Sequence, residues 1–346
     1  RLMPARLDDL ARSLEGVQRL LILPHNDPDP DAIASALALR TLLKSPWPAY
    51  EGRSLDVEAD LVYRGIIGRA ENKALVRYLG RPLRRLLAAE LRQDVPIALV
   101  DTQPGTGNNA LLPGQLPIIV FDHHPLRPGS AEVAFAEVRP DIGATSTILA
   151  GYLLAAGIEP EPPLATALYY GIKSDTLGLM REAGPEDMAV YHHLQGLVDL
   201  EALAEIENAQ VPNDYFKRLD AALHTARVYD GVILSYIGAM SRPDLAAELA
   251  DLLLRLQGTK WAVVMGVYRD ELIVSIRARN PVGGAGRLVQ SIVGEAGTAG
   301  GHGTMAAGHL PLGTRDPEEL SRELSQQVLF DLGVRAEGKP LLDGFE

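Results

Sequence analysis

A histidine and three aspartates lie within seven residues of one another in the stretch LPHNDPDPDAIASALAL (residues 23–39), directly before an apolar helical pattern. His25, Asp29 and Asp31 have the spacing His-x-x-x-Asp-x-Asp, in a turn between a predicted strand and a predicted helix. A loop can direct such side chains toward one small volume, where they would bind one or two divalent cations. They could equally be a hydrogen-bonded histidine at a strand end and two aspartates that cap the helix. The motif alone supports both interpretations.

Two later apolar runs also end in ionisable residues. VPIALVD ends in Asp101, and LPIIVFDHH ends in Asp122, His123 and His124. Alone, Asp101 is better explained as a loop or cap residue, whereas three adjacent ionisable residues at a strand end call for a cation to organise them. Because the carboxyl ends of parallel strands meet at one edge of a sheet, we expect all four side chains to lie near His25.

A further aspartate, Asp175 in GIKSDTLGL, follows a long apolar pattern and by itself is expected to cap the next turn. With the strand-end residues it completes a set of imidazole and carboxylate donors in a chain that has no cysteine. Such donors suit Mn²⁺, Mg²⁺, Fe²⁺ or Co²⁺ and are less typical of structural zinc. Two such ions about 3.5–4 Å apart assist in-line displacement at phosphorus. The donor set therefore predicts a dinuclear centre for phosphoryl chemistry.

The elements that must position these residues alternate between strands and helices. The predicted strands are residues 18–25, 57–65, 95–101 and 116–124, and the predicted helices are residues 31–45, 72–91, 143–157 and 162–172. This alternation predicts an α/β domain with a mostly parallel sheet flanked by helices.

A polar helical segment, residues 191–227, is expected to connect this first domain, residues 1–190, to a second domain, residues 228–346. The predicted elements of the second domain are antiparallel strands at 231–239, 261–270 and 271–280 and helices at 243–257 and 285–296. The second domain is therefore predicted to be a smaller α+β domain.

The second domain also contains an arginine-bearing strand followed by a glycine-rich stretch. The residues concerned are Arg277 and Arg279 of SIRARN, and Gly300, Gly301, His302 and Gly303 of GGHG. Glycine lets a backbone approach a phosphate, and arginine binds phosphate through two parallel hydrogen bonds. A glycine-rich loop alone would be a tight turn, but its combination with arginine favours an anion site. We expect this site to bind the distal phosphate or base of a substrate, across a cleft from the metal ions.

Composition restricts the class of partner. The chain of 346 residues suggests two domains, and its formal charge of −12 argues against long nucleic acid as the main ligand, because phosphate contacts dominate that affinity. No apolar run reaches the ~18 residues of a membrane span, and the first residues do not resemble a secretory signal. The absence of cysteine fits a reducing compartment. We therefore expect a cytoplasmic protein.

In chain order, HNDPDPD, LVD, DHH and SDT resemble the four motifs of the DHH phosphoesterase superfamily. GGHGTMAAG resembles the glycine-histidine motif of the DHH-associated domain found in one branch of that superfamily. The motifs span nearly the whole chain, and their ordered set is highly specific. They are most similar to those of the stand-alone oligoribonuclease (nanoRNase) and 3′-phosphoadenosine-5′-phosphate (pAp) phosphatase group. The resemblance implies an active site in the cleft between the two domains, and a homodimer formed through the first.

The resemblance also divides the candidate ligands between two ions, with Mn²⁺ preferred over Mg²⁺, Co²⁺ or Fe²⁺. It implies one ion on His25, Asp29 and Asp101, and the other on Asp31, Asp101, His123 and Asp175. Asp101 would thus bridge the ions as a catalytic residue. Asp122 would orient a neighbour, and His124 would contact the scissile phosphate or act as the general acid. Arg277 occupies the Ser-x-Arg position of the family.

The chain departs from the family pattern at a few positions. Ala299 stands where a third glycine is usual, and Leu179 and Met180 follow SDT where an aromatic residue is common. The second departure bears on base stacking and hence on the preferred substrate. Asp27 receives no role and is expected to be solvated.

These features predict a metal-dependent hydrolase of short oligoribonucleotides (nanoRNA) or of small phosphorylated nucleotides such as pAp and pApA. One alternative is an inorganic pyrophosphatase, which shares the metal motifs; the glycine-histidine stretch argues against it. Another is a nucleotide-binding sensor without catalysis, which the presence of every expected ligand argues against. Neither long duplex DNA nor a membrane is an expected partner.

Overall fold

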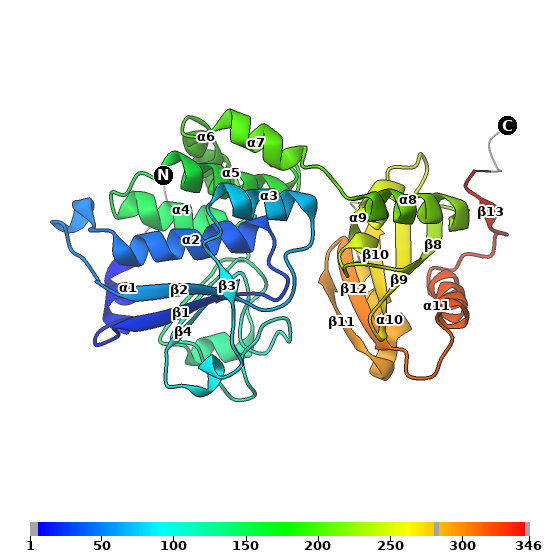
Figure 1. Cartoon of the computed structure of the whole chain (residues 1–346), viewed down its shortest axis with the longest axis horizontal. Helices are drawn as coiled ribbons and strands as arrows, with labels where there is room; N and C mark the ends of the chain where they lie inside the picture. The colour runs from blue at the N-terminus through cyan, green and yellow to red at the C-terminus, as the bar shows by residue number, and fades with distance from the viewer. Residues whose placement is uncertain (1–5, 280–283, 343–346) are drawn as a thin grey trace. The chain divides into compact units, whose positions relative to one another are not determined.

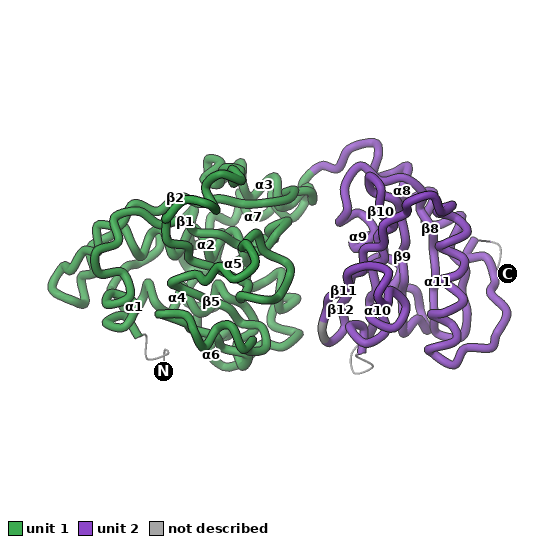
Figure 2. Tube along the Cα trace, turned by 90° about the horizontal axis from the view of Figure 1, so that it is seen from below, with its two compact units in different colours: residues 1–209 green, residues 210–346 purple. Residues whose placement is uncertain are grey.

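The computed structural model describes residues 6–279 and 284–342, and the chain divides into two compact units. Unit 1 is Arg1–Ala209 and unit 2 is Gln210–Glu346, as Figure 2 shows by colour. The division falls within the polar helical segment predicted as a connector. Within the described ranges, no helix combines the length and apolar character needed to cross a bilayer.

Unit 1 is built on one six-stranded sheet (Figure 1). Its strands are β1 (Arg19–Pro24), β2 (Glu58–Tyr63), β3 (Arg84–Arg85), β4 (Ile97–Val100), β5 (Ile119–Asp122) and β6 (Phe135–Val138). They lie in the order β3-β2-β1-β4-β5-β6, and every neighbouring pair is parallel. The predicted α/β class with a mostly parallel sheet is therefore confirmed.

Seven α-helices accompany this sheet in the described part of unit 1. They are α1 (Leu7–Ser13), α2 (Pro30–Lys44), α3 (Ala70–Tyr78), α4 (Thr145–Ala155), α5 (Pro162–Thr176), α6 (Pro185–Gln195) and α7 (Leu200–Glu207). The helix predicted over 72–91 is wrong beyond Tyr78, because Gly80 has a φ of 73° and Pro82 follows it. Asp175 was expected to cap a turn after a helix, but it lies in the last turn of α5.

The sheet of unit 1 buries apolar side chains on both faces. Leu20 and Ile22 of β1 belong to the core that includes α2 and α4, whereas Leu21 and Leu23 pack with Leu99 on the opposite face. Burial on both faces is typical of a parallel sheet. It leaves the carboxyl ends of β1, β4 and β5 as the edge at which the polar residues of the sequence motifs emerge.

Unit 2 contains a seven-stranded sheet with the order β11-β12-β10-β9-β8-β7-β13. Its strands are β7 (Arg227–Val228), β8 (Val232–Ala239), β9 (Trp261–Tyr268), β10 (Glu271–Ala278), β11 (Thr298–His302), β12 (Met305–Pro311) and β13 (Lys339–Pro340). Its described helices are α8 (Asn213–Thr225), α9 (Leu245–Leu253), α10 (Ala285–Val293) and α11 (Pro317–Asp331).

Two details of unit 2 differ from the sequence-based expectation. The first two predicted strands, β8 and β9, pair in parallel rather than antiparallel, because α9 supplies a crossover between them. The glycine-rich stretch is not a loop throughout: Thr298–His302 forms β11, which pairs with β12 in a hairpin. The α+β character of this unit is confirmed.

Candidate metal centre

The loop between β1 and α2 holds its histidine and its first aspartate by local hydrogen bonds. Nδ1 of His25 donates to the carbonyl oxygen of Asn26 (2.8 Å), which leaves Nε2 facing two carboxylates. Nε2 lies 3.7 Å from Oδ1 of Asp29 and 3.4 Å from Oδ2 of Asp101. Asp29 is also the N-cap of α2 and accepts a hydrogen bond from the backbone of Ala32 (3.0 Å). Asp29 therefore caps α2 and also lies among the candidate metal ligands.

Asp101, directly after β4, offers its two carboxylate oxygens to two different histidines. Oδ2 faces His25, and Oδ1 lies 3.6 Å from Nε2 of His123. The hydroxyl of Thr145 donates to the same Oδ1 at 2.8 Å. Asp101 is almost fully buried and has a φ of 59°, a left-handed conformation that non-glycine residues seldom adopt. Backbone strain of this kind clusters at functional sites.

Asp31, in the first turn of α2, is fully buried against the start of α4. Its Oδ2 accepts a hydrogen bond from the backbone of Thr145 (2.8 Å), and its Oδ1 accepts one from the backbone of Ser146 (2.7 Å). The residue before α4, Ala144, supplies no side-chain cap. Asp31 therefore accepts hydrogen bonds from the free backbone N–H groups at the amino terminus of α4, which begins 114 residues further along the chain.

His123, directly after β5, presents a buried and unsatisfied nitrogen to the centre. Its Nδ1 donates to the carbonyl oxygen of Ile142 at 3.2 Å. Its Nε2 lies 3.4 Å from Oδ2 of Asp175 and, among the described atoms, has no hydrogen-bond partner. A buried imidazole nitrogen between carboxylates is the arrangement that a divalent cation satisfies.

Three groups of side chains each bring their donor atoms within 4.8 Å of one another. The groups are His25 with Asp29 and Asp101, Asp31 with His123 and Asp175, and Asp101 with His123 and His124. All the donors are imidazole nitrogens or carboxylate oxygens, so they fit the divalent ions expected from the sequence. The third group overlaps both others, which is consistent with one continuous cluster.

The charges of the cluster are strongly coupled. Burial disfavours the protonated imidazole of His25, but the carboxylates of Asp101 and Asp29 outweigh burial and raise its pKa well above the usual value. For His123, Asp175 and Asp101 likewise overcome burial and raise the pKa. Burial, reinforced by the negative charge of Asp29, raises the pKa of Asp175 to about 6. In the absence of cations, the cluster therefore retains protons that bound cations would displace.

A second network lies beside the cluster and fixes His124. Oδ1 of Asp122 accepts hydrogen bonds from Nδ1 of His124 (2.8 Å) and from the backbone of His123 (3.0 Å). Oδ2 of Asp122 accepts one from Nε2 of Gln103 (2.6 Å). Oε1 of Gln103 in turn accepts from the hydroxyl of Ser130 (2.8 Å). Asp122 and Gln103 are fully buried, whereas the side chain of His124 is about one-third exposed.

Of the residues predicted to bind substrate, Arg277 lies in β10 of unit 2. It is largely buried; its Nε donates to the carboxylate of Asp251, and its Nη1 donates to the carbonyl oxygen of Ile276 (3.0 Å). Arg279 is held differently, since its Nε and Nη2 donate to the carbonyl oxygens of Thr259 (2.8 Å) and Leu254 (2.9 Å) at the end of α9. The structure thus engages both guanidinium groups locally.

The glycines predicted to bind substrate lie in and next to the hairpin of β11 and β12. Gly300 and Gly301 lie in β11, and Gly303 lies in the turn to β12. Gly301 has a φ of 151°, and a Cβ there would come within 2.4 Å of Ala306, so the tight hairpin requires glycine. The side chain of His302 lies outside the described part of the structure.

Sequence reasoning missed several residues that hold the cluster. Thr145 and Ser146 belong to a segment that was predicted only as a helix, and Gln103 follows Asp101 without any pattern to distinguish it. Asp27 was expected to be solvated only. It is exposed, but its Oδ1 accepts a hydrogen bond from the backbone of Ile66 (2.6 Å). These contacts join segments far apart in sequence, which no local motif reveals.

Comparisons with known proteins match part of the chain to a family and its fold to a solved structure. The family model described as the DHH family, N-terminal domain, matches residues 19–172. An uncharacterized protein of Methanocaldococcus jannaschii is 36% identical over 331 residues, covering 92% of this chain; the chain spans 65% of the length of that relative.

Among solved structures, the fold is similar to that of an exopolyphosphatase-related protein from Bacteroides fragilis. The TM-score is 0.72 at 15% identity, covering 95% of this chain and 97% of that one. Residues 19–172, which carry the candidate ligands His25, Asp29, Asp31, Asp101 and His123, therefore match the model of a DHH family domain, and the chain shares its fold with the Bacteroides fragilis protein.

Proposed function

We propose that this protein is a dinuclear metal-dependent phosphoesterase of the oligoribonuclease and pAp phosphatase type. The observation that carries the proposal is the position of Asp101. Its two oxygens face His25 and His123, each of which also faces a further aspartate, Asp29 or Asp175. One buried carboxylate between two histidine–aspartate pairs is a suitable bridge between two ions.

The residues divide into metal-binding and proton-handling groups in this proposal. The ligands of the two ions are His25, Asp29 and Asp101, and Asp31, Asp101, His123 and Asp175. When bound, two divalent ions, preferably Mn²⁺, supply an activated water and neutralise charge on the phosphoryl oxygens. Asp122 orients His124 through Nδ1, so Nε2 is the nitrogen that contacts the scissile phosphate or donates a proton to the leaving oxygen.

Unit 2 supplies substrate recognition in the same proposal. Arg277 and Arg279 bind the distal phosphate or base, together with Gly300, Gly301, His302 and Gly303. Arg279 follows β10 and is held by carbonyl oxygens near the end of α9. The substrates are short oligoribonucleotides, pAp or pApA. The net charge of −12 favours a short anionic substrate, held by metal ions and a few arginines, over a long nucleic-acid strand.

Initial rates with Mn²⁺ across di- to penta-ribonucleotides, pAp, pApA and pyrophosphate test the proposal. We expect turnover of at least one nucleotide substrate. The variant Asp101→Asn should lose turnover while its circular dichroism spectrum is unchanged, and Asp94→Asn, an exposed aspartate, is the matched control. Mn²⁺-dependent hydrolysis by Asp101→Asn at the wild-type rate would refute the assignment. Preferential hydrolysis of pyrophosphate would instead identify a pyrophosphatase.

A further inference from the structure

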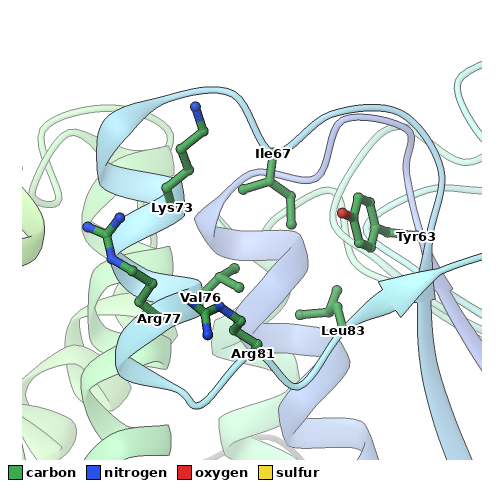
Figure 3. A pocket seen from close by; sticks show the side chains of 7 residues that line it. All are labelled: Tyr63, Ile67, Lys73, Val76, Arg77, Arg81 and Leu83. Carbon is green, nitrogen blue, oxygen red and sulfur yellow. The ribbon is translucent and has the colours of Figure 1, made fainter. Parts of the chain in front are cut away.

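A pocket separate from the metal centre opens at the carboxyl end of β2. It has a volume of about 330 Å³ and is lined by Tyr63, Ile67, Lys73, Val76, Arg77, Arg81 and Leu83. Figure 3 shows the side chains of Tyr63, Ile67 and Leu83 on one side and those of α3 on the other. None of these residues belongs to the three groups of metal donors. The pocket is therefore a distinct feature of unit 1.

Three cations line this pocket, and it has no acidic lining residue. Over the described ranges, no ion pair or side-chain hydrogen bond engages Lys73, Arg77 or Arg81. The neighbouring Arg84 behaves differently, since it pairs with Glu90 (2.7 Å) and with Asp60. The positive charge of these three side chains thus has no acidic partner among the described residues, while that of Arg84 is neutralised.

The positions of these cations are unfavourable unless an anion binds. Lys73 and Arg77 are four residues apart on α3, where like charges repel. Arg81 has a φ of 56°, a left-handed conformation that a long side chain seldom adopts. Solvated cations on a helix face would explain Lys73 and Arg77, but they would not explain why the strained turn adds a third positive charge to the same pocket.

The remaining walls suit a ring-shaped group. Ile67, Val76 and Leu83 are apolar, and Tyr63 contributes an aromatic ring that is also covered by Arg85, whose guanidinium carbon lies 5.6 Å from the ring centroid. Ligand pockets typically have volumes of about 300–1,000 Å³ and combine apolar walls with a few polar groups. Apolar and aromatic walls bind a base by burial and stacking, and arginine binds phosphate.

We propose that this pocket binds a nucleoside monophosphate, with its base against Tyr63, Ile67 and Leu83 and its phosphate on Lys73, Arg77 and Arg81. The inference does not depend on the activity proposed for the metal centre. A phosphate alone would lack the apolar contacts, and a nucleoside alone would lack the ionic ones.

Isothermal titration of AMP into the full chain tests this proposal. The titration is made with EDTA present, so that no cation in the metal centre can bind the phosphate. We expect one AMP to bind per chain. Adenosine and inorganic phosphate should each bind at least about tenfold more weakly than AMP, because each lacks one set of contacts. AMP affinity should also fall when the salt is raised from about 0.05 to about 0.5 M.

The variant Arg77→Gln/Arg81→Gln should bind AMP at least about tenfold more weakly than the wild type. Lys44→Gln/Arg92→Gln removes the same number of charges from exposed positions outside the pocket and should bind AMP as the wild type does. All these side chains are exposed, so the variants should fold, as thermal melting can verify. Absence of AMP binding, equal binding of adenosine, or equal losses in the two double variants would each overturn the proposal.

Discussion

The hydroxyl of Thr145 donates a hydrogen bond of 2.8 Å to Oδ1 of Asp101, the oxygen that also faces His123. Thr145 is the first residue of α4, so a helix terminus sets the orientation of the carboxylate between the two candidate ion sites. Residues that orient metal ligands usually influence affinity almost as much as the ligands themselves.

Replacing Thr145 by valine keeps the shape of the side chain but removes this hydrogen bond. We expect Thr145→Val to weaken Mn²⁺ binding by about 10–100-fold, measured by isothermal titration. Thr145→Ser keeps the hydroxyl and should remain close to the wild type. If the valine and serine variants bind Mn²⁺ equally well, the hydrogen bond does not orient Asp101.

Gln103 is expected to act on His124 through Asp122. Gln103→Met removes the donor to Asp122 and leaves buried polar partners unsatisfied, which should lower the free energy of unfolding by about 1–3 kcal/mol. Since Gln103 makes no hydrogen bond to the proposed ligands of the two ions, Mn²⁺ affinity should change little while kcat falls more than KM rises. Steady-state kinetics and Mn²⁺ titration on the same variant separate these effects. Loss of Mn²⁺ affinity with an unchanged kcat would contradict the role.

The stability of the protein without metal should fall as the pH rises. The pKa of Asp175 is raised to about 6, and the pKa values of His25 and His123 are also raised. The folded chain therefore binds more protons than the unfolded chain from about pH 4 upward, so the free energy of unfolding decreases through this range. Mn²⁺ binds the deprotonated ligands, and its stabilising effect should be larger at about pH 8 than at about pH 6.

Thermal melting with EDTA and with Mn²⁺, at both pH values, checks this prediction. A sample in EDTA that melts at a higher temperature at the higher pH would contradict it. His25→Gln removes one of the proton-retaining groups and should make the pH dependence in EDTA shallower.

Gly65, in the loop after β2, is expected to be critical for the shape of the loop between β1 and α2, which carries His25 and Asp29. A Cβ at Gly65 would come within 2.3 Å of Oδ1 of Asp27, whereas one at Gly80 would meet open space. Both glycines have a positive φ, 89° and 73°, so the two alanine variants share the backbone strain of about 1–2 kcal/mol. Gly65→Ala alone should also weaken Mn²⁺ binding, as titration can measure. Equal Mn²⁺ affinity in both variants would show that the loop of Gly65 does not influence the loop that carries His25 and Asp29.

The sequence was sufficient for the features that depend on local pattern. Apolar runs that end in polar residues located β1, β4 and β5, and the rule for parallel sheets brought Asp101 and His123 to one edge. It was insufficient where a contact joins distant segments. The bond from Thr145 to Asp101 spans 44 residues, and the parallel pairing of β8 with β9 depends on a crossover rather than on strand composition. The roles of the site residues stay predictions, which the variants described above test.

Besides their place in the cluster, Asp31 caps α4 and Asp29 caps α2. In evolution, a descendant of this domain that lost catalysis would therefore still be selected to keep both aspartates for folding. Its sequence would retain the DPD of the first motif, while His25 and Asp175, which cap no helix, would be free to diverge. Among homologues, those two positions would distinguish active from inactive domains better than the acidic motif does.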